Sequence, residues 1–429
     1  MSIVLKKPLD DERLARAGFS DASVSVVVQE IIDAVRERGD DALREYSARL
    51  DSWEPNSFRL SEEQVEQCVA SVPAEVIADI EFCQRQVRTF AEAQRGTMQD
   101  LEVEIRPGIR LGHRNLPIDN VAAYVPGGRY PMVASAHMSV ITAAVAGVRR
   151  IVACTPPLQG QVPATTVTAM HMAGATEIYV MGGVQALAAL AFGSESVPPV
   201  DFIVGPGNAY VAEAKRQLFG QVGIDLLAGP TEILVVADET ASAEIVAADL
   251  LGQAEHGPGS PAVLVTTSRA LATDVLAQID RQLATLPTAD VASTAWSSVG
   301  EIHVVDSLEE CLEIADRYAF EHVEILTQDP RWFLERMHNY GALFLGEGTT
   351  VAYGDKTIGT NHILPTGGAA RYSGGLWVGK FLKTVTYQEC DPAASVEIGE
   401  ICARMCRIEN FEGHARTCDV RVAKFSGAR

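Results

Sequence analysis

Residues 201–219 read Asp201-Phe-Ile-Val-Gly205-Pro-Gly-Asn208-Ala-Tyr-Val-Ala-Glu-Ala-Lys-Arg-Gln-Leu-Phe219, and this stretch decides the expected fold. Its first four residues predict a short strand, the next four a glycine turn, and the last eleven a helix. A strand, a turn and a helix in direct succession are typical of a parallel sheet with right-handed crossovers.

The same alternation extends to both sides of this stretch. Strands are predicted near 120 and at 150–154, 177–181, 201–204, 233–237, 262–266, 302–305 and 323–326. Helices are predicted between them at 139–147, 164–173, 184–192, 209–219, 270–283 and 308–318. The expected fold class is therefore α/β, with two doubly wound units. Residues 20–90 are expected to form flanking helices, with a capping box at Ser61, and the chain beyond Ser395 one long helix and a closing strand.

Composition excludes several classes of partner. The chain has 429 residues, more than one core usually serves, so at least two folding units are expected. Its 56 acidic and 35 basic residues give a net charge of -21, which argues against nucleic acid or an anionic membrane surface. The eight cysteines are scattered without a CxxC pair, and no signal peptide or spanning segment is expected. These features predict a cytoplasmic protein with reduced thiols.

Three glycine turns point to a ligand crevice. The turns at Gly127-Gly128, Gly182-Gly183 and Gly205-Pro-Gly-Asn208 each follow a predicted strand. Turns of this kind present backbone N–H groups to a phosphate or cofactor. None is the dinucleotide fingerprint GxGxxG, and one such turn alone is often only a turn.

A second stretch carries side chains that could bind a metal. Gln253 and His256 lie three residues apart at the end of a predicted helix, so they share one face. An oxygen and a nitrogen ligand on one face suit a metal ion, although a histidine in this position is as often a helix cap.

Glu321 and His322 form an adjacent acid and imidazole at a helix-to-strand junction, where they could act as an acid/base pair or be an ordinary surface pair. Asp355 and His362 lie in a glycine-rich loop, where an apolar core cannot explain them. Gln253, His256, Asp355 and His414 are a possible set of metal ligands with nitrogen and oxygen donors. Their spacing in the sequence does not require that they come together, so this assignment stays open.

Long segments of the chain resemble the histidinol dehydrogenase family. The resemblance covers nearly the whole length, and its most specific segments are Ala123-Tyr-Val-Pro-Gly-Gly128, Leu187-Ala-Ala-Leu-Ala-Phe-Gly193, Val204-Gly-Pro-Gly-Asn208, Leu227-Ala-Gly-Pro-Thr-Glu232, Gln253-Ala-Glu-His-Gly-Pro258 and Gly359-Thr-Asn-His-Ile-Leu-Pro-Thr366. Enzymes of this family use zinc and two NAD in succession to oxidise a primary alcohol through an aldehyde to a carboxylate. They are domain-swapped homodimers with two incomplete Rossmann-like domains.

The resemblance implies a role for individual residues. Gln253, His256, Asp355 and the partner subunit's His414 would bind Zn²⁺. His322 would take the hydroxyl proton in each oxidation, and Glu321 would activate water. Three further positions match NAD contacts, namely Tyr124, Gln185 and Asn208, and two match substrate contacts, namely Thr231 and Glu409.

The resemblance also implies a division of the chain. Residues 1–20 would form an N-terminal arm, and 21–122 with 233–374 a first Rossmann-like domain that carries the zinc and catalytic residues. Residues 123–232 would form a second Rossmann-like domain for NAD, and 375–429 a dimerisation tail.

Several positions depart from the enzyme of histidine synthesis. Thr231 replaces a serine, Lys356 follows the expected zinc ligand Asp355, and Arg129 and His137 add donors near the first glycine turn. Added cationic groups suggest a small anionic alcohol as substrate, although they could be solvated loop charges.

At these positions the chain is similar to the sulfopropanediol dehydrogenase branch of the family. Enzymes of that branch oxidise 2,3-dihydroxypropane-1-sulfonate to sulfolactate. Lys356 is the first expected sulfonate contact, with Arg129, His137 and His362 as further substrate contacts. Histidinol oxidation and a non-catalytic paralogue are the alternatives.

Overall fold

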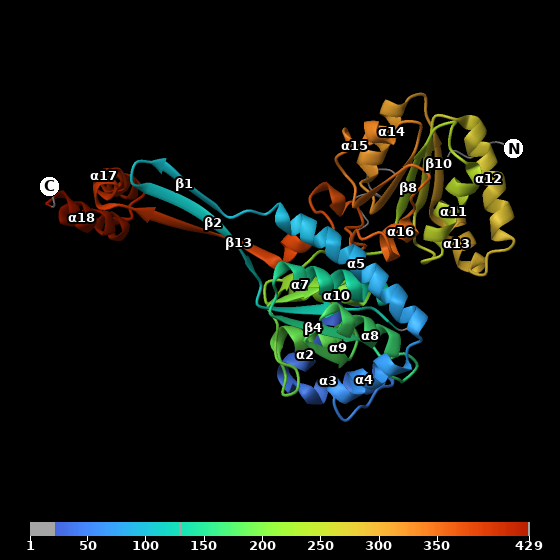
Figure 1. The fold of residues 1–429 in the computed structure, drawn as a ribbon, viewed down its shortest axis with the longest axis horizontal. Coiled ribbons are helices and arrows are strands. Elements are labelled where there is room, and N and C mark those ends of the chain that lie inside the picture. Colours follow the sequence, from blue (N-terminus) through green and yellow to red (C-terminus); the bar gives the residue numbers. More distant parts are fainter. Residues whose placement is uncertain (1–21, 128–130, 428–429) are drawn as a thin grey trace.

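Two five-stranded parallel sheets form the two lobes of the molecule (Figure 1). The computed structural model describes residues 22–127 and 131–427. Sheet one runs in the order β5-β4-β3-β6-β7 and sheet two in the order β10-β9-β8-β11-β12. In each sheet the first strand is central, the next two strands are added on one side of it, and the last two are added on the other side. The predicted α/β class with parallel sheets is confirmed.

The strands are short, apolar and buried, as parallel strands covered on both faces must be. Sheet one consists of β3 (Asn120–Tyr124), β4 (Arg150–Thr155), β5 (Glu177–Val180), β6 (Phe202–Val204) and β7 (Gly223–Ile224). Sheet two consists of β8 (Ile233–Ala237), β9 (Ala262–Thr266), β10 (Gly300–Val304), β11 (His322–Leu326) and β12 (Ala342–Leu345). Every residue of β8, β9 and β11 is buried.

Helices alternate with these strands, as the sequence predicts. Around sheet one lie α6 (Val133–Ala136), the π-helix η1 (His137–Ile141), α7 (Thr142–Ala146), α8 (Ala164–Ala173), α9 (Gly183–Phe192) and α10 (Ala209–Leu218). Around sheet two lie α11 (Ala243–Ala254), α12 (Arg269–Leu283), α13 (Ala289–Val299), α14 (Leu308–Tyr318), α15 (Pro330–Leu334) and α16 (Val351–Lys356).

The N-terminal helices cover sheet one. They are α2 (Ala22–Arg38), α3 (Asp40–Asp51), α4 (Glu62–Ser71) and α5 (Ala74–Gly96), and the predicted capping box of Ser61 with Gln64 is present. Val28 and Leu43 share a buried cluster with Ala122 and Leu187. Val65 of α4 lies in the other buried cluster of sheet one, with Val121 and Ile151. The expectation that residues 21–122 join sheet two is therefore wrong for α2 to α4, because their apolar faces are buried against sheet one.

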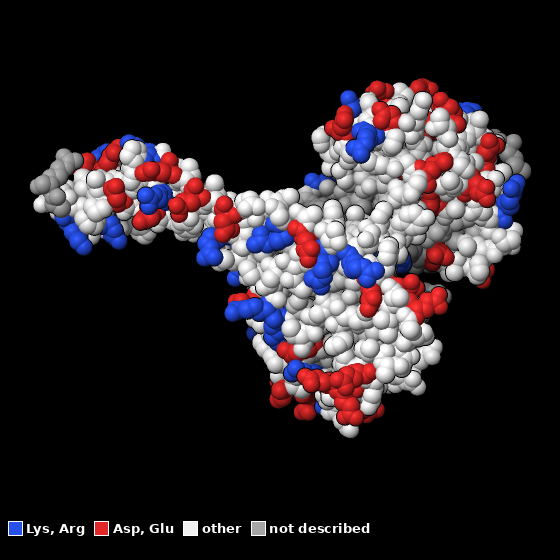
Figure 2. Space-filling view, viewed as in Figure 1, with Lys and Arg blue, Asp and Glu red and all other residues white. Residues whose placement is uncertain are grey.

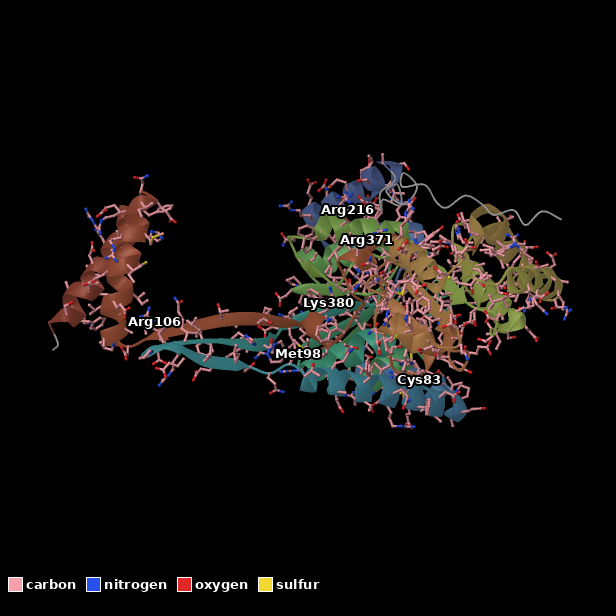
Figure 3. The ribbon with its side chains drawn as sticks, turned by 90° about the horizontal axis from the view of Figure 1, so that it is seen from above. Cys83, Met98, Arg106, Arg216, Arg371 and Lys380 are labelled. Atoms are coloured by element: carbon pink, nitrogen blue, oxygen red, sulfur yellow. The ribbon has the colours of Figure 1, made fainter. Side chains whose placement is uncertain are left out.

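A long arm projects from the lobes (Figure 1). Its stem is an antiparallel sheet of β1 (Leu101–Arg106), β2 (Ile109–Pro117) and β13 (Leu382–Cys390), and its tip is a hairpin of α17 (Pro392–Ile408) and α18 (Glu412–Ser426). Arg106, labelled near the tip in Figure 3, contacts Glu397 of α17 at 2.6 Å. The predicted single helix with a closing strand is wrong, because the backbone turns left-handed at Asn410 (φ +63°) and a second helix follows.

The arm exposes many large apolar side chains. They include Leu101, Val103, Ile105, Val385, Tyr387, Ile401, Met405, Ile408, Phe411 and Val420. Exposed apolar surface of this extent marks an interaction surface. Acidic side chains gather on the outer faces of the lobes and basic ones around the base of the arm (Figure 2). Among the described helices, none has both the length and the apolar character needed to cross a bilayer.

Candidate active site

The two sheets meet by opposite edges. At the carboxyl edge of sheet one, Ser135 of α6 contacts His362 through Oγ and Nε2 at 2.9 Å, and Gly229 donates its N–H to Thr366 Oγ1 at 2.6 Å. At the amino edge of sheet two, β8 and β11 begin side by side, with Ile233 paired to His322. The residues just before these two strands therefore face the junction of the lobes.

Glu321 lies at this junction and is buried. Its Oε2 accepts the Thr231 hydroxyl at 2.5 Å and the Glu232 N–H at 3.2 Å. Burial raises the pKa of Glu321 well above its usual value, and the hydrogen bond from Thr231 opposes that rise. A buried carboxylate with a raised pKa is a stronger base than one in water.

His322 has one ring nitrogen bonded and one free. Its Nδ1 lies 3.2 Å from the Glu232 carbonyl, which can only accept, so Nδ1 carries the proton in the neutral ring. Its Nε2 is buried without a hydrogen-bond partner in the described chain and lies 3.8 Å from Asp355 Oδ1. Burial lowers the pKa of His322 to about 4. The ring is therefore neutral at pH 7, with a lone pair on Nε2 directed at the junction.

Asp355, Gln253 and His256 converge on the same place. Asp355 makes no hydrogen bond through its carboxylate within the described residues, and burial raises its pKa to about 6 despite Lys356 Nζ at 3.8 Å. Gln253 is buried and donates its amide N–H to Thr231 Oγ1, which leaves its carbonyl oxygen available. His256 lies near enough to His322 to lower the pKa of that ring. A nearly buried carboxylate without a donor, an amide oxygen and an imidazole fit a zinc ion.

His414 and Glu409 lie elsewhere within one chain. Both are exposed at the tip of the arm, Glu409 after α17 and His414 in α18, far from α11 and α16 (Figure 1). One chain by itself therefore holds only three of the four predicted zinc ligands together.

The three predicted NAD contacts lie at the carboxyl edge of sheet one. Tyr124 ends β3, and its hydroxyl accepts the Gly183 N–H at 3.3 Å. Gln185 donates to Asp51 at 2.9 Å, while its Oε1 is buried without a partner in the described residues. Asn208 caps α10 by accepting the N–H groups of Tyr210 and Val211. Strands β3 and β6 are neighbours, so these residues flank the switch point where an α/β sheet binds ligands.

A buried ion pair fixes the turn between β6 and α10, and the sequence pattern did not reveal it. Lys215 pairs with Asp225 and donates to the Gly205 carbonyl at 2.8 Å, while Asp225 accepts the Gly205 N–H at 2.8 Å. Gly205 has φ +125°, and a Cβ there would lie 2.0 Å from the Tyr124 carbonyl oxygen. Only glycine fits this approach.

The remaining predicted substrate contacts differ in position. Thr231 bridges Glu321 and Gln253, and Lys356 is half-exposed beside Asp355. His362 lies between Ser135 and the Asp355 carbonyl. His137 is buried with Nδ1 against Gln84 at 3.2 Å, so only its Nε2 could reach a ligand. Arg129 lies outside the described residues.

Sequence reasoning missed three acidic groups around the site, of which Glu232 and Glu324 are buried and Asp249 is half-buried. Burial raises the pKa of Glu232 to about 8, and its Oε1 accepts the N–H groups of Glu321 and Gly367. Glu324 is fully buried near Asp249, and burial raises the pKa of both carboxyls. The available signal was an acidic residue inside an apolar strand, as in His322-Val-Glu-Ile-Leu326.

Comparisons with known proteins agree with this architecture. A sequence model of the family described as histidinol dehydrogenase matches residues 14–422. The chain is 59% identical over 406 residues to a histidinol dehydrogenase homolog of Shouchella clausii, covering 95% of this chain and 96% of that protein. It is 47% identical over 410 residues to sulfopropanediol 3-dehydrogenase of Ruegeria pomeroyi, covering 95% and 94%. The crystal structure of histidinol dehydrogenase from Elizabethkingia anophelis superposes with a TM-score of 0.90 at 32% identity, covering 95% and 94%.

Proposed function

The chain belongs to the histidinol dehydrogenase family of NAD-dependent enzymes that act on CH–OH groups, and we propose that it oxidises a small anionic primary alcohol to a carboxylate in two NAD-dependent steps. One observation carries the proposal. Glu321 and His322 are adjacent, buried and chemically distinct; Glu321 Oε2 lies 3.5 Å from His322 Nδ1, and His322 Nε2 lies 3.8 Å from Asp355 at the junction of the lobes.

Gln253, His256 and Asp355 would hold a Zn²⁺ ion. A bound zinc ion orients and polarises the substrate oxygen. Thr231 supports this arrangement because it links the Gln253 amide to Glu321, so the ligand and the base keep a fixed separation.

His322 would accept the hydroxyl proton. The Glu232 carbonyl holds the Nδ1 proton, so the base is Nε2, and burial keeps the ring neutral. As the proton leaves the alcohol, its carbon can give a hydride to NAD. The same nitrogen would serve again when the hydrated aldehyde is oxidised.

Glu321 would take a proton from the water that hydrates the aldehyde. This task needs a carboxylate whose pKa is nearer to neutral than that of an exposed glutamate, and burial supplies that shift. The Thr231 hydroxyl and the Glu232 N–H fix the direction of Oε2.

NAD would bind at the carboxyl edge of sheet one. The unpaired Gln185 Oε1 offers an acceptor to a cofactor donor, and the turn at Gly205 allows close backbone approach. That edge and the Glu321–His322 pair meet at the same junction, as hydride transfer requires.

We propose a homodimer in which the arm completes the site of the partner. The exposed apolar side chains of the arm need a cover, and His414 and Glu409 lie among them at its tip. His414 of the partner subunit would then be the fourth zinc ligand, and the partner's Glu409 a substrate contact.

Lys356 and one of the relatives support the proposed substrate class. Lys356 is a half-exposed cation next to Asp355, in reach of an anionic handle on the alcohol. Because a relative at 47% identity is named sulfopropanediol 3-dehydrogenase, we favour 2,3-dihydroxypropane-1-sulfonate, oxidised to sulfolactate. Histidinol is the second candidate, since the family model bears that name.

A substrate panel on the purified enzyme tests the proposal. NADH formation is measured with dihydroxypropanesulfonate, its uncharged diol analogue and histidinol. We expect turnover of the sulfonate, with the KM raised about tenfold or more in Lys356→Ala, a loss typical of one ionic hydrogen bond. Lys380→Ala, at the base of the arm (Figure 3), is the matched control. Turnover of histidinol alone would reject the sulfonate assignment.

Mixed dimers test the shared site. A His256→Ala chain and a His414→Ala chain each lack a proposed ligand, but a heterodimer of the two restores one complete site. We expect activity to reappear when the two variants are unfolded, mixed and refolded together. Inactive heterodimers would contradict the proposal that His414 acts in the partner.

A further inference from the structure

Three cysteines meet at the tip of the arm. Cys402 and Cys406 lie one turn apart on α17, and Cys418 lies on α18. Their sulfur atoms all lie within 4.8 Å of one another, and those of Cys402 and Cys406 are 3.9 Å apart. No part of the proposed dehydrogenase chemistry uses these thiols.

The separations suit one shared cation. A Zn–S bond is about 2.3 Å, so tetrahedral geometry places two sulfurs about 3.8 Å apart around a common zinc ion. Soft thiolates select Zn²⁺ over the hard cations Mg²⁺ and Ca²⁺. Cys402 is exposed and the other two thiols are half-buried, so a fourth position would be open to water.

The hairpin is held in place independently of the thiols. The Arg407 guanidinium contacts Asp419 at 2.5 Å and Glu412 at 3.1 Å, so it joins the end of α17 to α18. The helices also pack directly, with Val422 approaching Gly399. The three sulfurs are therefore positioned without a bound ion, and replacing one thiol should not unfold the tip.

The thiols are not arranged to be reactive. The Cys402 thiol raises the pKa of the Cys418 thiol through their hydrogen bond, so Cys418 is not activated as a thiolate nucleophile. Two cysteines four apart on one helix are also poorly placed for a disulfide, whose Cβ atoms must turn toward each other.

We propose that Cys402, Cys406 and Cys418 form a second zinc site, distinct from the N/O site at the junction of the lobes. It would clamp α17 to α18, one turn beyond His414. The proposal does not depend on the proposed function.

Cobalt substitution tests the site in the full-length protein. Metal-free enzyme is titrated with Co²⁺, and thiolate-to-cobalt charge-transfer absorption is recorded. The proposed N/O site has no sulfur ligand, so this absorption reports the cysteine site alone. We expect it in the wild type, its removal by added Zn²⁺, and its loss in Cys402→Ser and Cys418→Ser. In these variants the affinity of the cysteine site for Zn²⁺ should fall by more than roughly 10–100-fold, which is the loss caused by removing a residue that only hydrogen-bonds to a metal ligand.

Cys390→Ser is the matched control, because Cys390 is an exposed cysteine of the arm outside the cluster. It should keep the absorption, and circular dichroism should show that all variants are folded. Absence of charge-transfer absorption in the wild type would overturn the proposal. A disulfide among the three cysteines in protein purified with Zn²⁺ present, found by mass spectrometry, would also overturn it.

Discussion

Sheet one and sheet two share one strand order but place functional groups at opposite ends. In sheet one the candidate cofactor residues follow the strands, at Tyr124 and Asn208, where a parallel sheet is expected to bind ligands. In sheet two the candidate catalytic residues lie where β11 begins: Glu321 precedes the strand and His322 is its first residue. The sheets stack carboxyl edge to amino edge, so the two sets face each other. A shared topology therefore does not predict which edge carries the chemistry.

The two edges also neutralise buried acids differently. Sheet one pairs Asp225 with Lys215 in a buried ion pair. In sheet two, no Lys or Arg among the described residues forms an ion pair with Glu232 or Glu321, and burial raises the pKa of each, against a weaker lowering of the Glu232 pKa by Arg371. The first arrangement fixes a backbone turn, and the second produces carboxyl groups whose pKa values lie well above those of exposed glutamates.

The largest expected effect comes from removing the base at the amino edge. His322→Ala should lower the rates of both alcohol and aldehyde oxidation by about 10²–10⁴-fold, the usual contribution of a general base. NADH formation is followed with each substrate separately. Retention of either half-reaction would show that Nε2 is not the common base.

Glu321→Gln should slow aldehyde oxidation much more than alcohol oxidation. Aldehyde oxidation should fall by about 10²-fold, because the amide cannot take a proton from water, while alcohol oxidation changes little. The raised pKa also predicts an acid limb: aldehyde oxidation falls as the pH drops through the pKa of Glu321. That limb should vanish in the variant. Equal losses in both steps would refute the division of labour.

Glu232→Gln should affect stability at alkaline pH. The folded-state pKa of about 8 lies above the ordinary 4.5, so the protonated acid favours the fold below pH 4.5, and that contribution is lost as the pH rises through 8. The amide keeps the acceptor for Glu321 and Gly367 without ionising. Urea unfolding near pH 9 should show a gain of roughly 1–3 kcal/mol, and near pH 5 almost none. A gain of equal size at both pH values would exclude ionisation as the cause.

The smallest expected effect lies at the carboxyl edge of sheet one. Gly205→Ala should raise the KM for NAD by about tenfold, since the new Cβ displaces the Tyr124 carbonyl and the turn with it. Gly220→Ala is the control, because Gly220 also has a positive φ (+105°) but open space around its Cα. Similar behaviour of the two variants would mean that backbone strain, and not the contact with Tyr124, matters.

Sequence patterns could predict the two parallel sheets because their strands are apolar runs bounded by glycine turns. They could not predict β13, whose residues are almost all exposed and so lack a buried face. Helical periodicity predicted the helices α2 to α5, but it does not indicate against which sheet the apolar face of each helix packs.

The candidate site was harder to predict than the fold. Gln253, Glu321 and Asp355 come from three separate segments, and the pairing of β11 with β8 on one side and β12 on the other brings them together. Pair register is not encoded in any local pattern, so the resemblance to a family had to connect them. Glu232 escaped notice because it adjoins the apolar run of β8, and its burial depends on the loop at Gly367.

The pairing of β2 with β13 has a consequence for biosynthesis. Leu382 pairs with Pro117, so roughly 260 residues are translated between the two partners, which takes about 10–50 s at ordinary elongation rates. During that interval β2 has an open edge on the nascent chain, and open edges invite aggregation. Exposed charged side chains on β2, such as Arg110 and Arg114, disfavour pairing of this edge with another chain until β13 has been synthesised.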